Sequence, residues 1–339
     1  MTAFSSVEFL PRAVVDRITE ARVADPELPR RAAQARVRRP ILAPAGRLNL
    51  LAADHPARNV TRVGQDELAM ADRRDYLARI LRVLSVERVD GIMATMDILE
   101  DLLAIDALLR ERSAPTFLDG RVVIASLNRG GLAGSSWELD DPVTGATPAA
   151  CAAWRLDGAK LLMRVDETDP ASLRTMMYCA QAIREANAEN LPTFLEPLPV
   201  TRGPRGYSVT RTADTLAKLA GVASAMGDSS RLLWLKLPWC QNFEIVARAT
   251  TLPILLLGGE SSGSASGFLA ELRSALEAAR NIRGALVGRN VLYPGDQDPA
   301  VIADAAGRIV HEDSPADRAL SAADNESARG LDRLAPLNR

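Results

Sequence analysis

Short apolar runs alternate with longer amphipathic stretches along most of this chain. Eight runs have the length and composition of strands, at residues 48–53, 89–95, 121–127, 158–165, 192–198, 232–237, 252–258 and 283–288. Helical patterns lie between them, for example at residues 73–84, 98–110 and 267–279. Because an eightfold alternation of strand and helix favours a closed parallel barrel over a doubly wound sheet, we predict an α/β protein with a single (β/α)8 TIM barrel.

Different patterns flank the alternating region. Residues 1–39 are rich in arginine and have a helical pattern, and we interpret them as an N-terminal helical extension. Residues 40–295 would form the barrel. From about residue 296 the sequence turns polar, which predicts a peripheral C-terminal helix or tail over 296–339. The extension is also a candidate subunit contact of a homo-oligomer.

Alternate positions of the fourth run differ in polarity. Lys160, Leu162, Arg164 and Asp166 share one face, whereas positions 159, 161, 163 and 165 are all apolar. Successive side chains of a strand point to opposite faces, so the apolar face would pack on helices and the ionisable face would point to the barrel axis. The same parity places further polar residues inside the barrel, at Asp54, Ser126, Asn128, Glu196, Lys236 and Arg289. Buried charges that serve packing alone are the alternative for any one of them.

Lys236 stands in the apolar run LLWLKLP of a chain that contains only three lysines among 41 basic residues. The others are Lys160 and Lys218. Such a bias towards arginine suggests that position 236 needs an amine and not simply a positive charge. A lysine with apolar neighbours loses its proton more easily than arginine and can attack a carbonyl to form a Schiff base. The alternative is a lysine on an edge strand that keeps its amine in water.

Composition excludes several classes of function. The chain of 339 residues is 47% hydrophobic, with a net charge of −2 and a pI near 5.9, so we expect no nucleic-acid or membrane partner. Three cysteines without close spacing favour reduced thiols and a cytoplasmic location, and we find no targeting signal. With two histidines, His55 and His311, a zinc site is not expected.

Five short motifs together resemble a known family. They are Asp54-His55 after LNLLAA, Lys160 in GAKLLMRVD, Glu196 in FLEPL, Lys236 in LWLKLP and Gly288-Arg289 in GALVGRN. In order and strand register they resemble the class I, Schiff-base aldolases of the DeoC/LacD/archaeal fructose-bisphosphate aldolase group. The resemblance covers roughly residues 40 to 295 and is nearest to an actinobacterial branch linked with inositol catabolism. It implies a lyase that needs neither metal nor other cofactor.

The resemblance also implies roles for individual residues. Lys236 would form the Schiff base, with Lys160 as a second active-site lysine and Glu196 as general acid and base. Asp54 would be a polar or proton-relay partner, although it also fits a strand-end turn cap. The substrate or its phosphate would be held by Arg289, Gly258, Gly259, Ser261, Gly288, Asn128 and His55.

Residue chemistry adds two expectations about proton transfer. The apolar frame of Glu196 should raise its pKa, and an ammonium at Lys160 should lower the pKa of Lys236. One departure from a phosphate site is the charge of Glu260 in the loop that follows the seventh run.

The resemblance implies a phosphorylated ketose or keto acid as substrate. The suggested reaction splits 5-dehydro-2-deoxy-6-phosphogluconate into dihydroxyacetone phosphate and malonate semialdehyde. Tagatose-bisphosphate, sulfofructose-phosphate or deoxyribose-phosphate cleavage are alternatives. A different class is suggested by Gly259 to Gly263, which match G-x-S-x-G, with Asp296 or Asp298 and His311 completing a hydrolase order after Ser261. A barrel that binds a phosphosugar without an imine is the third interpretation.

Overall fold

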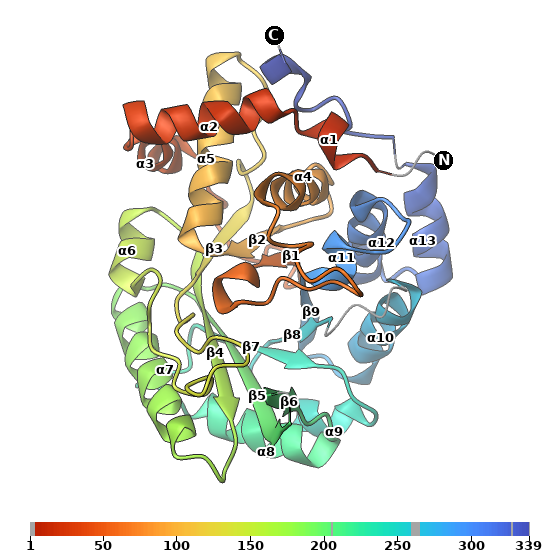
Figure 1. Ribbon diagram of the computed structural model, residues 1–339. Coiled ribbons are helices and arrows are strands. Elements are labelled where there is room, and N and C mark those ends of the chain that lie inside the picture. Colours follow the sequence, from red (N-terminus) through yellow and green to blue (C-terminus); the bar gives the residue numbers. More distant parts are fainter. Residues whose placement is uncertain (1–3, 205, 259–264, 327, 339) are drawn as a thin grey trace.

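The computed structural model describes residues 4–204, 206–258, 265–326 and 328–338 (Figure 1). Its parallel strands pair in chain order, and β4 pairs with β5 while β9 pairs with β1, so the sheet closes on itself. The predicted (β/α)8 TIM barrel is therefore confirmed. Its strands are β1 (Leu48–Ala53), β2 (Gly91–Ala94), β3 (Val122–Ser126), β4 (Gly158–Val165), β5 (Thr193–Gly203), β7 (Leu233–Pro238), β8 (Ile254–Leu257) and β9 (Ile282–Val287).

Helices surround the barrel, and the patterns at 73–84, 98–110 and 267–279 each coincide with one of them. The Asp72 side chain accepts hydrogen bonds from the first-turn amides of Arg74 and Asp75 and so fixes where α4 begins. The helices after β1 are α4 (Arg73–Leu84), α5 (Met96–Glu111), α6 (Pro148–Ala153), α7 (Ala171–Ala188), α8 (Ala213–Ser224), α9 (Phe243–Arg248), α10 (Ala265–Ala278), α11 (Arg289–Leu292), α12 (Pro299–Glu312) and α13 (Ala316–Asn325), with 3-10 turns at Pro56–Arg58 and Ala335–Asn338.

The strands divide their side chains between two cores, as the parity predicts. One core fills the barrel and contains Leu48, Leu50, Ile124, Phe194 and Leu286 among others. The residues next to them in sequence face outward into a larger core with the helices. These apolar side chains fill the part of the barrel nearer the amino ends of the strands. The ionisable residues on the same strand faces come later in each strand and therefore lie at its carboxyl end.

Three helices precede the barrel, α1 (Ser6–Phe9), α2 (Arg12–Ala24) and α3 (Leu28–Ala35). Figure 1 shows α2 and α3 beside α5, and Arg22 of α2 forms an ion pair of 2.7 Å with Asp101 of α5. After α3, the buried Arg36 donates hydrogen bonds to the backbone oxygens of Arg121 and Arg155 and to Asp157. The extension thus reaches the amino ends of β3 and β4.

The polar C-terminal region contains an element that belongs with the barrel. Most residues of α12 are buried, and the helix packs against α4, α10 and the strands β1 and β9. The predicted division at residue 295 separates this helix from the barrel. Among the described residues, no helix is both long and apolar enough to cross a membrane.

One strand was not predicted. β6 (Gly206–Val209) runs antiparallel to the end of β5, pairing Val200 with Val209, and the two form a hairpin beyond the barrel. The Tyr207 hydroxyl donates a 2.6 Å hydrogen bond to Asp169 in the loop before α7. The hairpin therefore stands over the carboxyl ends of the strands.

Candidate active site

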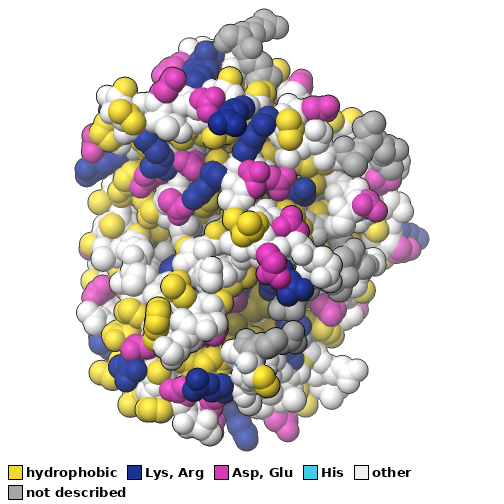
Figure 2. All heavy atoms as spheres, viewed as in Figure 1, with side chains coloured by type: hydrophobic (Ala, Val, Ile, Leu, Met, Phe, Trp, Pro, Cys, Tyr) yellow, Lys and Arg dark blue, Asp and Glu magenta, His cyan; other side chains and the backbone are white. Residues whose placement is uncertain are grey.

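A cavity of about 540 Å³ opens at the carboxyl ends of the barrel strands. Apolar side chains, including Leu162, Leu198 and Leu257, make part of its wall, and ionisable groups make the rest. Eight predicted site residues line it, namely Asp54, His55, Lys160, Glu196, Lys236, Gly258, Gly288 and Arg289. On the face shown in Figure 2, basic and acidic side chains are interspersed, and neither sign of charge is concentrated in one patch.

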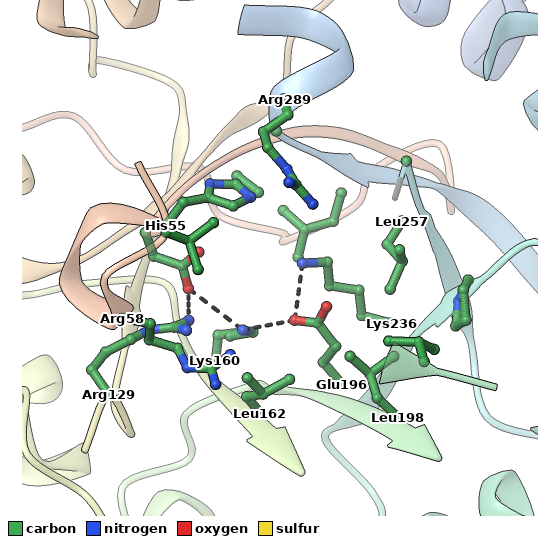
Figure 3. Close-up of a pocket in the computed structure, with 18 of the residues that line it drawn as sticks. His55, Arg58, Arg129, Lys160, Leu162, Glu196, Leu198, Lys236, Leu257 and Arg289 are labelled. Carbon is green, nitrogen blue, oxygen red and sulfur yellow. Dashed lines mark hydrogen bonds and ion pairs between the residues drawn. The ribbon is translucent and has the colours of Figure 1, made fainter. Parts of the chain in front are cut away.

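Two lysines share one carboxylate in this cavity. Glu196 Oε2 lies 2.7 Å from Lys160 Nζ and 3.0 Å from Lys236 Nζ (Figure 3). All three side chains are nearly enclosed, with exposures of 8% for Glu196, 1% for Lys160 and 6% for Lys236. They come from β5, β4 and β7, so the barrel itself brings them together.

The contacts continue from Lys160 to the first and third strands. Asp54 Oδ2 lies 3.4 Å from Lys160 Nζ and accepts a 2.7 Å hydrogen bond from the Ser126 hydroxyl. Arg129, three residues after Ser126, forms an ion pair with the same Asp54 oxygen and donates to Ser126 Oγ at 2.9 Å. Asp54 is therefore part of an ionic network and not a turn cap.

Both buried lysines have lowered pKa values. Burial lowers the pKa of Lys236 below its ordinary value, Glu196 opposes this, and the charges of Arg129 and Arg289 lower it further. Burial also lowers the pKa of Lys160, helped by Arg129 and opposed by Glu196. The sequence led us to expect that Lys160 lowers the pKa of Lys236, whereas the cations that lower it in the structure are Arg129 and Arg289.

The expected raised pKa of Glu196 is wrong. Burial alone would raise it, but the positive charges of Lys160 and Lys236 and their hydrogen bonds lower the pKa of Glu196 well below its ordinary value. The apolar residues beside Glu196 in sequence do not decide its environment, because the side chain points into a charged interior. Glu196 is therefore a carboxylate at neutral pH.

His55 and Arg289 lie together on another side of the cavity (Figure 3). Burial and the charges of Arg289 and Lys236 lower the pKa of His55 well below its ordinary value, so the ring is neutral. A Cβ at position 288 would lie 2.3 Å from His55 Cε1 and 2.6 Å from the oxygen of Ala52. Gly288 is thus required by the close packing of this histidine ring.

The predicted phosphate loop is described only at its start. Gly258 lines the cavity, and its carbonyl accepts a hydrogen bond from the side chain of Asn290, which ties the end of β8 to α11. Gly259, Glu260 and Ser261 lie outside the described residues. Their proposed contacts with phosphate stay predictions.

Asn128 does not line the cavity. Its side chain accepts a 2.8 Å hydrogen bond from the amide of Leu162 and donates one of 2.6 Å to the carbonyl of the same residue. This pair of bonds fixes the upper part of β4 where its pairing with β3 has ended. Arg164, which lies on the same face of β4 as Lys160, donates hydrogen bonds to Glu138 and to the carbonyl of Gly131.

Two of the residues that suggested a hydrolase, His311 and Asp298, lie in other interactions, and Ser261 lies outside the described residues. His311 Nε2 lies 2.8 Å from Asp90, which precedes β2 at the amino end of the barrel, opposite the cavity. Asp298 caps α12 and pairs with Arg82 at 2.8 Å. No group of three or more His, Cys, Asp or Glu residues within the described parts of the chain is placed to hold a metal ion.

Sequence reasoning missed three arginines that line the cavity, Arg58, Arg129 and Arg211. Arg58 and Arg129 are buried, and Arg58 donates two hydrogen bonds to the carbonyl of Gly131. Arg58 ends the 3-10 turn after β1, and Arg129 and Arg211 lie in loops after strands, so strand parity applies to none of them. With 38 arginines in the chain, the residue type alone gave no signal.

Fold and site together define a parallel (β/α)8 barrel protein in which two buried lysines contact one glutamate at the carboxyl ends of the strands. The chain belongs to the Cgl0159-like family, whose model matches residues 46–307. The crystal structure of Cgl0159 from Corynebacterium glutamicum is 36% identical, with a TM-score of 0.83 over 90% of this chain and 98% of that one.

More distant relatives carry aldolase names. An uncharacterized aldolase from Saccharolobus solfataricus is 31% identical over 140 residues, which are 40% of this chain and 48% of the relative. This chain thus spans about half the length of that curated relative in the match. The structure of a Schiff-base-forming fructose-1,6-bisphosphate aldolase is 19% identical, with a TM-score of 0.56 over 83% of this chain and 99% of that one, a likeness of fold.

Proposed function

We propose that this protein is a class I aldolase that cleaves a phosphorylated ketose or keto acid through a Schiff base on Lys236. The observation that carries the proposal is the enclosed Lys236 amine, 3.0 Å from a carboxylate that also contacts Lys160. Burial and neighbouring cations favour the neutral amine, which is the nucleophile that imine formation requires. The relatives that carry aldolase names agree with this reaction class.

The residues would divide the reaction as follows. The Lys236 amine attacks the ketone carbon, and the carbinolamine loses water to give an iminium ion. Glu196, a carboxylate beside that nitrogen, accepts the proton of the substrate hydroxyl as the carbon–carbon bond breaks and an aldehyde departs. The bonding electrons move into the iminium and give an enamine. Protonation of the enamine and hydrolysis of the imine then release the second product and restore the amine.

The cations of the cavity support an anionic substrate. Arg289 lies beside the iminium position together with Lys236 and His55, and Arg58 and Arg211 contribute further positive charge to the lining. Within this class we propose 5-dehydro-2-deoxy-6-phosphogluconate as the first substrate to test, on the strength of the resemblance to the inositol-linked branch. Tagatose-bisphosphate, sulfofructose-phosphate and deoxyribose-phosphate form the comparison panel.

Trapping the imine tests the mechanism directly. Borohydride reduction with dihydroxyacetone phosphate should give a stable adduct on intact protein, and peptide mapping should place it on Lys236. Lys236→Ala should abolish the adduct, whereas Lys218→Ala, which changes the exposed lysine of α8, should retain it. An adduct on Lys160 would reverse the assignment of the two lysines. A wild-type protein that turns over the substrate panel without any adduct would contradict the imine mechanism.

A further inference from the structure

Arg129 is a buried arginine at the cavity wall that has no part in the proposed bond-making steps. Its guanidinium contacts Asp54 and Ser126, and Asp54 in turn contacts Lys160. Burial lowers the pKa of Arg129 to about 10, so it remains protonated at neutral pH. A full positive charge is therefore fixed one carboxylate away from the two lysines.

Direct contacts join five ionisable groups into one chain, Arg129, Asp54, Lys160, Glu196 and Lys236 (Figure 3). With both lysines protonated, these five groups would carry three positive charges and two negative ones. A net buried charge is costly, and a buried amine relieves it by giving up its proton. Without Arg129 the count would be two against two, and both lysines could stay protonated.

Other charged groups face the same lysines. Arg289 contributes a positive charge beside Lys236, and the neutral ring of His55 lies next to it. Arg58 donates to the carbonyl of Gly131, and the charges of Asp141, Glu138 and Glu196 oppose the lowering of its pKa by burial. Arg289 acts in the same direction as Arg129, and the negative charges that act on Arg129 include Asp141 and Glu196.

We propose that Arg129 is a positioning residue that cancels the charge of Asp54, so that the two lysines share the negative charge of Glu196 and one amine is left neutral. The proposal rests on the proposed function, since a neutral amine matters only if it attacks a carbonyl. It assigns to an arginine outside the proposed bond-making steps the control of the pH at which the nucleophile is available.

The test is the pH dependence of amine labelling in the full-length protein. Acetic anhydride acylates neutral amines, and mass spectrometry of peptides reads Lys160 and Lys236 separately, with the exposed Lys218 as internal reference. Arg129→Met should move the labelling midpoint of the more reactive buried lysine to higher pH by about one to two units. Arg129→Lys keeps the charge and should stay near the wild-type midpoint.

A double variant separates charge from structure. Asp54→Asn alone removes an anion and should move the midpoint to lower pH. Asp54→Asn combined with Arg129→Met removes one charge of each sign, so its midpoint should return towards the wild-type value. A purely structural role would instead leave the midpoint unmoved in Arg129→Met, or would give Arg129→Lys and the double variant the same defect as Arg129→Met.

The same variants tested with substrate keep the two proposals apart. The fraction of protein trapped by borohydride with dihydroxyacetone phosphate should fall at low pH. The pH at which it falls should move with the labelling midpoint in each variant. A wild-type protein that forms no imine overturns the proposed function, whatever the labelling shows. A wild-type protein that forms the imine while Arg129→Met keeps the wild-type midpoint overturns the role of Arg129 alone.

Discussion

Glu196 combines two tasks at the scale of one residue, because it holds both amines and is the proposed base. Glu196→Gln keeps the shape of the side chain but cannot accept a proton. We expect turnover to fall about 100- to 10,000-fold, the usual contribution of general acid–base catalysis, while the imine on Lys236 is still trapped by borohydride. Loss of the carboxylate lowers the pKa of Lys236 further, so nucleophilic attack should survive.

Steady-state rates measured together with the trapped fraction check this prediction. Glu189→Gln, on the exposed end of α7, is the matched control and should behave as wild type. Turnover within tenfold of wild type in Glu196→Gln would assign proton transfer to another group.

Strand parity was sufficient to place Asp54, Lys160, Glu196 and Lys236 in one cavity, because the period of two fixes which side chains point inward. It could not give their protonation states. The pKa of Glu196 depends on amines from β4 and β7, which only the closed barrel brings near, and not on the apolar residues beside it in sequence. Arg129 was missed because it follows β3 in a loop.

At the scale of elements, the hairpin of β5 and β6 was the main omission. Residues 206–209 are only partly buried and alternate too briefly to signal a strand, so tertiary contacts decide their conformation. One such contact is the 2.6 Å hydrogen bond from Tyr207 to Asp169. The eight barrel strands, by contrast, were predictable because each is an apolar run with a helix after it.

Tyr207→Phe should loosen this hairpin without unfolding the barrel. Tyr207, Ser208 and Val209 line the cavity, so we expect KM to rise several-fold with kcat nearly unchanged. A hydrogen bond of this kind contributes about 1 kcal/mol when partly exposed, which corresponds to roughly fivefold faster amide exchange in residues 199–210. Hydrogen exchange read by mass spectrometry checks this, with Tyr178→Phe as control. Unchanged exchange in the hairpin would show that the bond to Asp169 does not hold it.

At the scale of the whole molecule, the N-terminal extension fastens the amino end of the barrel. Arg36 is 2% exposed and bridges the starts of β3 and β4 through Asp157 and two backbone oxygens. Asp157 also accepts from the amide of Val123, so the arginine balances a carboxylate that itself orders a strand. The extension is therefore part of the folding unit, although its pattern in the sequence indicated only helices.

Arg36→Met should lower the free energy of unfolding by about 3 kcal/mol, because it leaves two carbonyls without this donor and removes the buried cation that pairs with Asp157. Arg38→Met is the matched control. Arg38 contacts the same Asp157 at 2.7 Å, but its side chain is 39% exposed, and its loss should cost less than about 1 kcal/mol. Urea unfolding of the three proteins measures both values. Equal losses would mean that burial of Arg36 contributes nothing beyond an ordinary surface pair.

The linked charges of the cavity also constrain how this family can diverge. Replacing either Asp54 or Arg129 alone changes the net charge of this buried cluster, so a lineage that changes Asp54 should change Arg129 as well. Glu196 has partners on two strands and should tolerate no exchange unless both lysines change. In homologous chains we therefore expect positions 54 and 129 to vary as a pair, and positions 160, 196 and 236 to be kept or lost as a set.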